Sequence, residues 1–337
     1  MKTLIIPPAE GRVLPFYLAA EEWVARNLDG ADDWFFAWQV EPTVICGRHQ
    51  EMPLEVDMDY ARDYGIQVWR RKSGGGCVYA DSHNVMFSYI TADRGGVQGC
   101  FTRYTGLVCG MLASLGIDAR PTGRNDIAVD GHKVAGNAFY RSHGRSIVHG
   151  TMLYDADPDT MGRVLTPSRA KLMSKSVVSV PARITTLRRC GIAISCDDFI
   201  RRAVTLLGSN GSYTLAPADV AAVEEIMQEY LQPGFLRREG VGMRAPGASR
   251  RIEGVGELSV SVDIAPGGII ARCAVGGDFF GSRDALERMC AALRGVSAER
   301  DPLTGVLGGF LPGDAVEGLD AATMAGLIIE ATKHTIP

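Results

Sequence analysis

The stretch that decides the expected fold is RRKSGGG at residues 70–76, directly after a short apolar run that is typical of a β-strand. Three consecutive glycines let the backbone approach a ligand closely and let their N–H groups converge on an anion. The cations upstream include Arg70 and Arg71, which suit bidentate phosphate contacts. The run is neither a Walker A loop nor a G-x-G-x-x-G fingerprint, and no lysine follows the glycines. By itself it fits a flexible turn beside a solvated basic patch equally well.

A second polar cluster lies at residues 123–138, where the turn sequence Asp130-Gly131 predicts a type I′ hairpin. Lys133 follows the turn between small residues that leave space for a ligand, and its ammonium could bridge an acyl carbonyl and an α-phosphate. The oxygens of Asn125 and Asp126 suit a Mg²⁺ ion that also touches phosphates. Taken alone, Lys133 fits a surface lysine on a polar hairpin better.

A third polar feature, His149-Gly150, opens an apolar strand-like run. A lone histidine in such a place is more often a structural residue than a catalyst. His132 and His143 are expected on exposed hairpins. The sequence has no Ser-His-Asp order and no cluster with metal-ligand spacing.

The composition is that of a globular chain of 337 residues, 46% hydrophobic and 22% charged, with a net charge of −4. This balance argues against nucleic-acid binding, for which a basic surface is the usual footprint. Eight cysteines without any C-x-x-C spacing indicate reduced thiols rather than a zinc site or a disulfide scaffold. No segment approaches the roughly 18 apolar residues of a membrane span, and the N-terminus does not resemble a signal peptide. We therefore expect a soluble, cytoplasmic protein without nucleic-acid or membrane partners.

Hydrophobic periodicity predicts mixed helices and strands over the first 231 residues. Helices are expected where apolar residues recur at helical spacing, at Phe16–Leu28, Asp59–Tyr64, Gly99–Leu115, Cys196–Leu207 and Pro217–Leu231. Strands are expected in short β-branched and aromatic runs, at Trp34–Val40, Thr43–Cys46, Gln67–Trp69, Val78–Tyr79, Val85–Ile90, Ile127–Val129, Lys133–Phe139 and Ser146–Tyr154.

A change of composition after Leu231 indicates a second, smaller unit. Gln232–Arg251 is rich in glycine and arginine and has little periodicity, so it is the expected linker. Beyond it we expect a hairpin and two helices, at Glu257–Ile264, Ile269–Val275, Asp284–Leu293 and Ala321–Lys333. The sequence therefore predicts an α+β fold with a larger domain at residues 1–245 and a smaller α+β domain at residues 250–337.

Several motifs in a fixed order resemble the lipoate-protein ligase signature. Its first block is two arginines, a variable residue, Ser-Gly-Gly-Gly, a small residue, Val, an aromatic, then Asp and Asn, and it falls here on Arg70–Asn84. The other catalytic-domain blocks match at Pro42–Gln50, Gly123–Ile127, Lys133–Ala138 and His149–Leu153. A later Lys…Lys…Ser-x-x-x-Arg-x-Thr-x-Leu block matches at Lys171, Lys175, Ser179, Arg183, Thr185 and Leu187.

The resemblance extends to the accessory C-terminal domain of the ligase A type, whose Gly-Asp-Phe-Phe segment matches within Gly276–Phe280. Two positions depart from the family pattern. His83 stands where glycine is usual, and Thr186 stands where asparagine is usual. The resemblance implies a biotin/lipoate ligase-like catalytic domain, with mixed sheets and flanking helices, followed by that smaller domain.

The resemblance also implies a two-step reaction that uses lipoate, ATP and Mg²⁺. Lipoate and Mg-ATP first give lipoyl-adenylate and pyrophosphate. A lysine of a carrier domain then attacks the mixed anhydride and releases AMP. The implied partners are the lipoyl-carrier domains of 2-oxoacid dehydrogenase complexes or the glycine cleavage H protein.

Carried over by position, the resemblance makes Lys133 the catalytic residue, in contact with both the lipoate carboxyl and the phosphate, and Asp126 a candidate Mg²⁺ ligand. The residues expected to bind ATP and lipoyl-AMP are Arg71, Gly76, Cys77, Val78, Tyr79, Asn125 and Lys133. Those expected at the acyl end are Arg70, Ser73, Gly75, His149 and Gly150. The lipoyl tail needs an apolar slot, for which Val44, Val78 and Met152 are candidate walls.

Rival interpretations keep the same fold. A transferase acting without ATP would pass the acyl group through a cysteine thioester, for which Cys77 and Cys190 are candidates. Another transferase would draw on preformed lipoyl-AMP. A non-catalytic lipoyl-binding protein would not need to retain Lys133 and Arg71. A biotin ligase is disfavoured because its Gly-Arg-Gly-Arg type of loop is absent.

Overall fold

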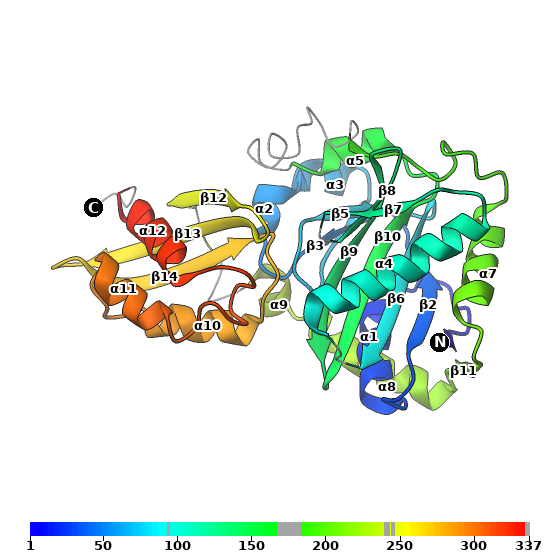
Figure 1. The fold of residues 1–337 in the computed structure, drawn as a ribbon, viewed down its shortest axis with the longest axis horizontal. Helices are drawn as coiled ribbons and strands as arrows, with labels where there is room; N and C mark the ends of the chain where they lie inside the picture. The colour runs from blue at the N-terminus through cyan, green and yellow to red at the C-terminus, as the bar shows by residue number, and fades with distance from the viewer. Residues whose placement is uncertain (93–94, 124, 167–182, 239–242, 244–246, 334–337) are drawn as a thin grey trace.

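A computed structural model of the chain describes residues 1–92, 95–123, 125–166, 183–238, 243 and 247–333. The chain up to residue 238 forms a larger lobe and the chain from residue 247 a smaller one (Figure 1). Both combine sheets with flanking helices, which confirms the predicted α+β class. Three positions of the later ligase-like block, Lys171, Lys175 and Ser179, lie outside the described residues.

Eight strands form the main sheet of the larger lobe. In chain order they are β1 (Lys2–Ile5), β2 (Trp34–Trp38), β6 (Asn84–Ala92), β7 (Arg120–Thr122), β8 (Asp126–Val129), β9 (His132–Ser142), β10 (Arg145–Leu153) and β11 (Ser212–Thr214). Their order across the sheet is β11-β1-β2-β6-β10-β9-β8-β7. β1 is parallel to both of its neighbours, and the other neighbouring pairs are antiparallel.

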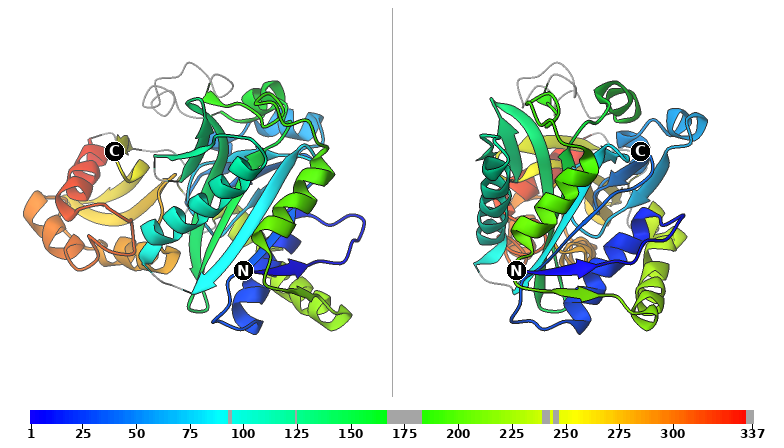
Figure 2. Two further views of the ribbon diagram at one scale, coloured as in Figure 1. Left: turned by 45° about the vertical axis from the view of Figure 1, so that its right-hand side comes forward. Right: turned by 90° about the vertical axis from the view of Figure 1, so that its right-hand side faces the viewer.

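Helices cover both faces of this sheet (Figure 2). Because side chains alternate along a strand, Phe35 and Phe87 pack in one core while Phe36 and Ile90 pack in the other. The first core is closed by α4 (Gly96–Ser114) and α7 (Cys196–Leu207), and the second by α1 (Leu14–Asn27) and α8 (Pro217–Leu231). Within the described ranges, no helix has the length and hydropathy that crossing a bilayer requires.

A separate three-stranded sheet carries the glycine-rich stretch. Its central strand β3 (Thr43–Cys46) is parallel to β4 (Gln67–Arg70) and antiparallel to β5 (Val78–Ala80). We call residues 71–77, which join β4 to β5, the glycine loop. Short helices surround this sheet, at α2 (Met52–Glu55), α3 (Met58–Asp63), α5 (Pro158–Val164) and α9 (Pro233–Arg237).

The smaller lobe is an antiparallel sheet packed against helices. Its strands are β12 (Ala248–Ile252), β13 (Gly256–Ala265) and β14 (Ile269–Gly277), and its helices are α10 (Arg283–Ala292), α11 (Arg300–Leu307) and α12 (Ala321–Thr332). The lobe has a hydrophobic cluster of its own, which includes the fully buried Leu258, Ile270, Leu303 and Met324. Asp320 caps α12 by accepting a hydrogen bond of 2.8 Å from the Thr323 N–H.

The structure confirms most predicted elements and corrects one stretch. The turn at Asp130-Gly131 has positive φ at both residues, 47° and 78°, as a type I′ turn requires. The predicted helices Cys196–Leu207 and Pro217–Leu231 are found with the same bounds. The prediction that Gln232–Arg251 is a linker is wrong at both ends of this range, because its first residues form α9 and its last residues form most of β12. The short strands β1, β7 and β11 were not predicted.

Residues 276–280 join the smaller lobe to the glycine loop. The Gly75 N–H donates to the Phe279 carbonyl at 3.3 Å, and the Gly277 N–H donates to the His49 carbonyl at 2.9 Å. The rings of His49 and Phe279 stack with centroids 4.6 Å apart. Phe280 reaches the core under α4 and packs against Phe101. The position of the smaller lobe is therefore coupled to the backbone of the glycine loop.

This interface makes stability depend on pH. Burial lowers the pKa of His49 to about 3, against about 6.5 for an unfolded histidine. Between these values the unfolded chain binds a proton that the folded chain does not, so the stabilisation is complete above pH 6.5 and declines as the pH falls toward 3. We expect this residue to lower the free energy of unfolding by up to about 1.4 kcal/mol per pH unit below 6.5.

Urea unfolding midpoints between pH 5 and 7.5 measure this dependence. His49→Gln should flatten the slope below pH 6.5, whereas His83→Gln, at an exposed position, should leave it as in the wild type. Equal slopes for the wild type and His49→Gln would contradict the assignment.

Candidate active site

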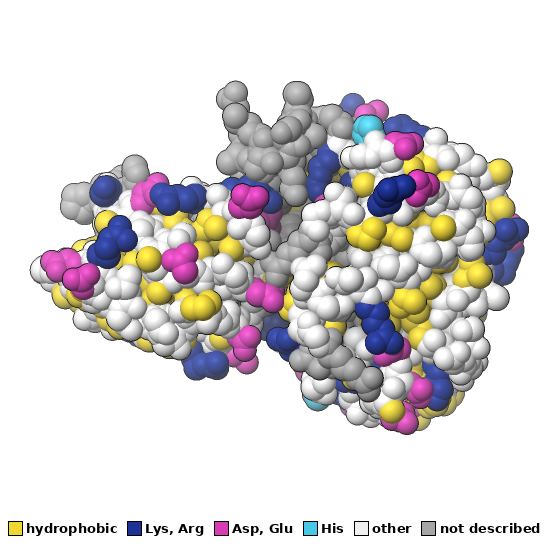
Figure 3. Space-filling view, viewed as in Figure 1, with side chains coloured by type: hydrophobic (Ala, Val, Ile, Leu, Met, Phe, Trp, Pro, Cys, Tyr) yellow, Lys and Arg dark blue, Asp and Glu magenta, His cyan; other side chains and the backbone are white. Residues whose placement is uncertain are grey.

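A cleft of 1110 Å³ lies between the glycine loop, strands β8 to β10 and the smaller lobe. Figure 3 shows the molecule narrowing between its two lobes. Ten of the predicted site residues line the cleft: Arg71, Gly75, Gly76, Cys77, Val78, Asn125, Asp126, Lys133, His149 and Gly150. The smaller lobe adds a wall that the sequence did not predict, formed by Arg251 to Gly256, Asp278, Phe280, Glu317 and Gly318.

Arg71 holds the glycine loop in shape. Its guanidinium donates to the carbonyls of Ile45, Gly74 and Gly76 at 2.7–2.8 Å, and its Nε donates to the Ser73 hydroxyl at 2.9 Å. Gly75 has φ of +86°, which a residue with a side chain rarely adopts. The donors that we expected to bind phosphate are thus directed at the loop itself, although Arg71 also borders the cleft.

Lys133 extends from the start of β9 into the cleft. Its ammonium lies 2.8 Å from Asp126 Oδ1, and Arg183 pairs with the other oxygen of the same carboxylate. A Cβ on Gly136 would lie 2.2 Å from the Lys133 Nζ, so the missing side chain at that position provides the space for the ammonium. The cleft therefore has two cations that converge on one carboxylate.

Asn125 is part of a closed pair with Asn137 on the neighbouring strand. The Asn137 amide donates to the Asn125 carbonyl at 2.8 Å, and the Asn125 amide donates to the Asn137 carbonyl. The Asn137 backbone N–H donates to the same Asn125 carbonyl at 3.0 Å. This pairing fixes the segment that precedes Asp126. It uses the side-chain NH₂ group of Asn125, which borders the cleft, and does not use the side-chain oxygen, which is an acceptor.

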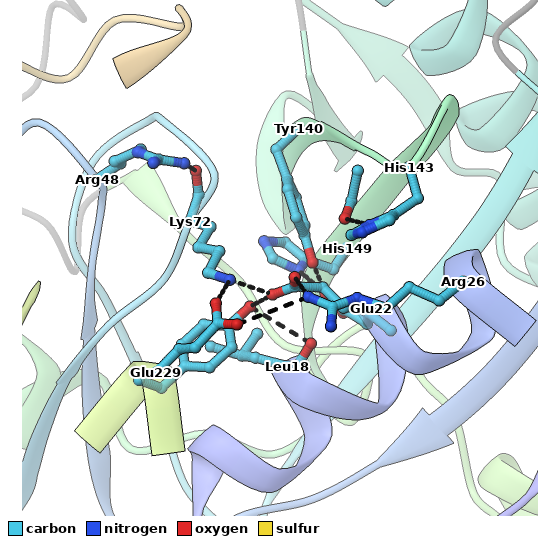
Figure 4. A network of polar contacts seen from close by, with 12 residues as sticks. Leu18, Glu22, Arg26, Arg48, Lys72, Tyr140, His143, His149 and Glu229 are labelled. Atoms are coloured by element: carbon cyan, nitrogen blue, oxygen red, sulfur yellow. Dashed lines mark hydrogen bonds and ion pairs between the residues drawn. The ribbon is translucent and has the colours of Figure 1, made fainter. Parts of the chain in front are cut away.

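The lysine of the glycine loop is neutralised by two carboxylates. Lys72 Nζ lies 2.7 Å from Glu22 on α1 and 2.7 Å from Glu229 on α8 (Figure 4). Glu22 also pairs with Arg26 and accepts from the Tyr230 hydroxyl. Lys72 thus ties the loop to two helices and supplies no charge to the cleft.

A buried line of hydrogen bonds connects the loop to α1. His149 Nε2 lies 2.6 Å from the Ser73 hydroxyl, and His149 Nδ1 lies 2.8 Å from Glu21, which also accepts from the Tyr140 hydroxyl at 3.3 Å. Because Arg71 Nε donates to Ser73, the serine proton is directed to His149. Ser73 and Glu21 have no exposed surface, so no substrate atom reaches this serine. The line positions the loop and provides no nucleophile.

An apolar wall borders the part of the cleft that faces α1. It is formed by five side chains from different elements: Leu18, Trp38, Ile45, Val78 and Met86. Of the three predicted walls only Val78 belongs to it. Val44 and Met152 are buried in separate cores because they point to the opposite faces of their strands.

Three other predicted residues lie outside the cleft lining. The Arg70 guanidinium points away from the cleft and donates to the carbonyls of Gly47, Gln50 and Leu236 at 2.8–3.0 Å. Ser73 is covered by the loop. Tyr79 is buried in the core of the small sheet, where burial raises the pKa of its hydroxyl.

Neither candidate cysteine has the setting of an acyl-carrying thiolate. Cys77 borders the cleft, but its thiol lies 2.9 Å from the Cys46 thiol on β3. Cys190 is not in the lining of the cleft, and burial raises the pKa of its thiol. A raised pKa lowers the fraction of thiolate, which is the nucleophilic form.

The cleft thus combines a lysine, an apolar wall and a glycine-rich loop. The model of the lipoyl protein ligase A/B catalytic domain matches residues 15–207. The chain is 31% identical over 302 residues to lipoate-protein ligase LplJ of Bacillus subtilis (strain 168), covering 87% of this chain and 89% of that protein. It is 31% identical to a lipoate–protein ligase of Streptococcus pyogenes, covering 80% and 82% of the two chains.

The chain therefore belongs to the lipoate-protein ligase family, and its activity is the ligation of lipoate to protein. Solved structures agree on the fold. P. falciparum LipL1 in complex with lipoate has a TM-score of 0.76 at 17% identity, covering 98% of this chain and 99% of that one. Lipoate-protein ligase A bound with ATP has a TM-score of 0.60 at 23% identity, covering 69% and 97%.

The space beside Gly136 gives a direct test of the lysine position. In Gly136→Ala the new methyl group would overlap the Lys133 ammonium, so the flexible lysine must move while the backbone stays in place. We expect the ligation rate to fall by at least about tenfold, with a change in unfolding free energy of less than about 1 kcal/mol. Steady-state ligation rates and urea unfolding measure the two effects.

Gly106→Ala on α4 is the matched control, because a Cβ there meets nothing within 4 Å. It should leave the ligation rate unchanged. A wild-type rate in Gly136→Ala would show that the position of the ammonium is not required.

Proposed function

We propose that ligation runs through lipoyl-adenylate formed beside Lys133. The observation that supports this is the convergence of Lys133 and Arg183 on Asp126 in the cleft that the apolar wall borders. When the lipoate carboxylate and the α-phosphate lie at this point, the Lys133 ammonium contacts both and stabilises the charge that develops during attack. The carboxylate oxygen attacks the α-phosphorus, a P–O bond to the β-phosphate breaks, and pyrophosphate leaves.

The lipoyl tail occupies the apolar wall in this proposal. Leu18, Trp38 and Met86 bury its methylene groups, which are worth about 0.8 kcal/mol each. The nucleotide lies toward the glycine loop, where the backbone of Gly75–Val78 borders the cleft. Arg71 contributes by holding this backbone, and His149 contributes through Ser73.

Asp126 and Asn125 suit a Mg²⁺ ion that enters with ATP. Protein Mg²⁺ sites commonly have one or two carboxylates and complete the octahedron with phosphate oxygens and water. Asp126 offers one carboxylate in the cleft, and the described residues contain no group of three or more His, Cys, Asp or Glu side chains that would bind a metal without ATP. When bound, the ion would neutralise phosphate charge, while Lys133 and Arg183 turn from Asp126 to the substrate oxygens.

The acceptor in this proposal is a lysine on a lipoyl-carrier domain, which attacks the mixed anhydride and releases AMP. A similar solved structure, with a TM-score of 0.61 at 24% identity, belongs to an archaeal bipartite lipoate protein ligase that was studied with its E2 lipoyl domain. The carriers that we propose are the lipoyl domains of 2-oxoacid dehydrogenase complexes or the glycine cleavage H protein.

We also propose that residues 1–245 and 250–337 are separate domains. The hydrophobic cluster of the smaller lobe consists of residues between 248 and 331, without a side chain from the larger lobe. Such a cluster supports independent folding of each part.

Exchange of labelled pyrophosphate into ATP, with lipoate and Mg²⁺ present, tests the adenylation step. We expect Lys133→Ala to lower the exchange rate by about 100-fold or more, the usual cost of removing one donor to a developing charge. Addition of an apo lipoyl domain should then give a mass increase on one carrier lysine with the wild type only.

Cys190→Ser is the control, because a thioester route would need a cysteine and the adenylate route does not. It should retain the wild-type exchange rate. Full exchange in Lys133→Ala would remove Lys133 from the proposed mechanism.

A further inference from the structure

A second cavity, separate from the cleft, lies between the two lobes on the side to which Arg70 points. Its volume is about 180 Å³, and six arginines line it: Arg48, Arg70, Arg238, Arg272, Arg283 and Arg294. Glu287 is the one carboxylate in the lining, and His49, with a pKa of about 3, is neutral. The lining therefore has a formal charge of +5.

Both lobes contribute to this arginine cavity. Arg48 and Arg70 come from the larger lobe, and Arg238 ends the described chain before residue 243. The smaller lobe supplies Arg272 from β14, Arg283 from the start of α10, and Arg294 from the turn that follows α10. An anion bound here would contact cations of both lobes.

Backbone carbonyls hold Arg70 and Arg238, and Arg283 pairs with the Glu287 carboxylate. Arg70 donates to four carbonyls, and Arg238 donates to the carbonyls of His49 and Val275 at 2.7 and 3.0 Å. Arg238 has a carboxylate partner in Glu51. These bonds fix the guanidinium groups before any ligand arrives, so little entropy is lost on binding.

Carboxylates balance only part of the positive charge around the cavity, where Glu51 pairs with Arg238 and Glu287 with Arg283. Arg48 has a buried Nε without a hydrogen-bond partner among the described residues. Burial, and next the charge of Arg283, lower the pKa of Arg48. Burial likewise lowers the pKa of Arg238, and the charge of Arg283 acts in the same direction. Buried like charges are normally avoided, because each pair costs free energy that an anion between them would recover.

We propose that the arginine cavity is a binding site for a small phosphate-class anion, inorganic phosphate or pyrophosphate, that holds the two lobes together. Several guanidinium forks around one point suit the tetrahedral oxygens of phosphate. The volume admits a small oxyanion and excludes a nucleotide, whose sites are of 300 Å³ or more. The site goes beyond the ligase reaction, since its lining shares no residue with the lining of the cleft.

Binding at this site would act on the glycine loop. Arg70 is the last residue of β4, and the next residue, Arg71, begins the loop. Arg238 and His49 connect the cavity wall to the residues that dock the smaller lobe. A bound anion would therefore stabilise the docked arrangement in which residues 276–280 contact the loop.

Calorimetric titration of the full-length protein with inorganic phosphate and with pyrophosphate, at constant ionic strength set with chloride, tests the site. The wild type and Lys133→Ala should both bind one equivalent, because the arginine cavity is independent of the cleft. Arg272→Gln/Arg294→Gln should weaken binding by about tenfold or more. The control is Arg288→Gln, which removes an exposed arginine of α10 outside the lining and should bind as the wild type does.

Glu287→Gln gives an independent test, because it should strengthen anion binding where the double variant weakens it. This test can be used even if the double variant does not fold. It removes the carboxylate of the lining, so affinity for either anion should increase several-fold. The apparent melting temperature should rise with phosphate in the wild type and in Arg288→Gln but not in the double variant. If pyrophosphate binds more strongly than phosphate, the ligand is the reaction product. If phosphate binds more strongly, the ligand is the free phosphate ion.

Three results would overturn the proposal. The first is that the wild type shows no saturable binding. The second is that Lys133→Ala loses binding, which would place the anion in the cleft. The third is that the double variant and Arg288→Gln bind the anion with equal affinity. Absence of pyrophosphate exchange in the wild type, with intact anion binding, would instead count against the proposed adenylation mechanism and leave this site unaffected.

Discussion

Arg71 directs its guanidinium into the bend between β4 and β5, where three carbonyls and one hydroxyl accept from it. Backbone carbonyls in a tight loop would otherwise face one another, and a buried donor left without acceptors costs several kcal/mol. Burial lowers the pKa of this arginine, but the group remains a cation in an apolar setting. The shape of the glycine loop, and with it one wall of the cleft, depends on this side chain.

The need to satisfy the carbonyls around the glycine loop also explains how positive charge is distributed in the molecule. Of the three cations that precede the glycines, Arg70 supports carbonyls of neighbouring segments, Arg71 supports the loop, and Lys72 is paired with two glutamates. None of them is free to move toward a phosphate in the cleft. The cleft takes its positive charge from a different part of the sheet, where Lys133 and Arg183 meet at Asp126. Structural and chemical positive charges are thus kept on separate elements.

The sequence predicted much of this arrangement because its motifs mark segments that must meet. Arg71, Gly75 and Gly76 border one cleft together with the hairpin after Asp126 and with His149. The other assignments were wrong because side chains alternate along a strand, so that a shift of one residue reverses the face to which a side chain points. Val44 was predicted for the apolar wall, which Ile45 occupies instead, and Arg70 was assigned to the cleft although only Arg71 faces it. The partners of Lys72 lie more than forty residues away on either side of it, so no local pattern could indicate them.

The composition of the cleft has a consequence for the order in which the protein becomes functional during synthesis. Its lining begins at Leu18 and ends at Gly318, so the site includes segments that are far apart in the chain and are made at different times during translation. A ribosome releases the glycine loop and the lysine hairpin long before residues 251–256 and 317–318 exist. Domains commonly fold in the order of their synthesis, and one wall of the cleft is still absent when the larger lobe has been made. The nascent chain therefore exposes an open half-site, which is completed only after the smaller lobe has emerged and docked on the loop.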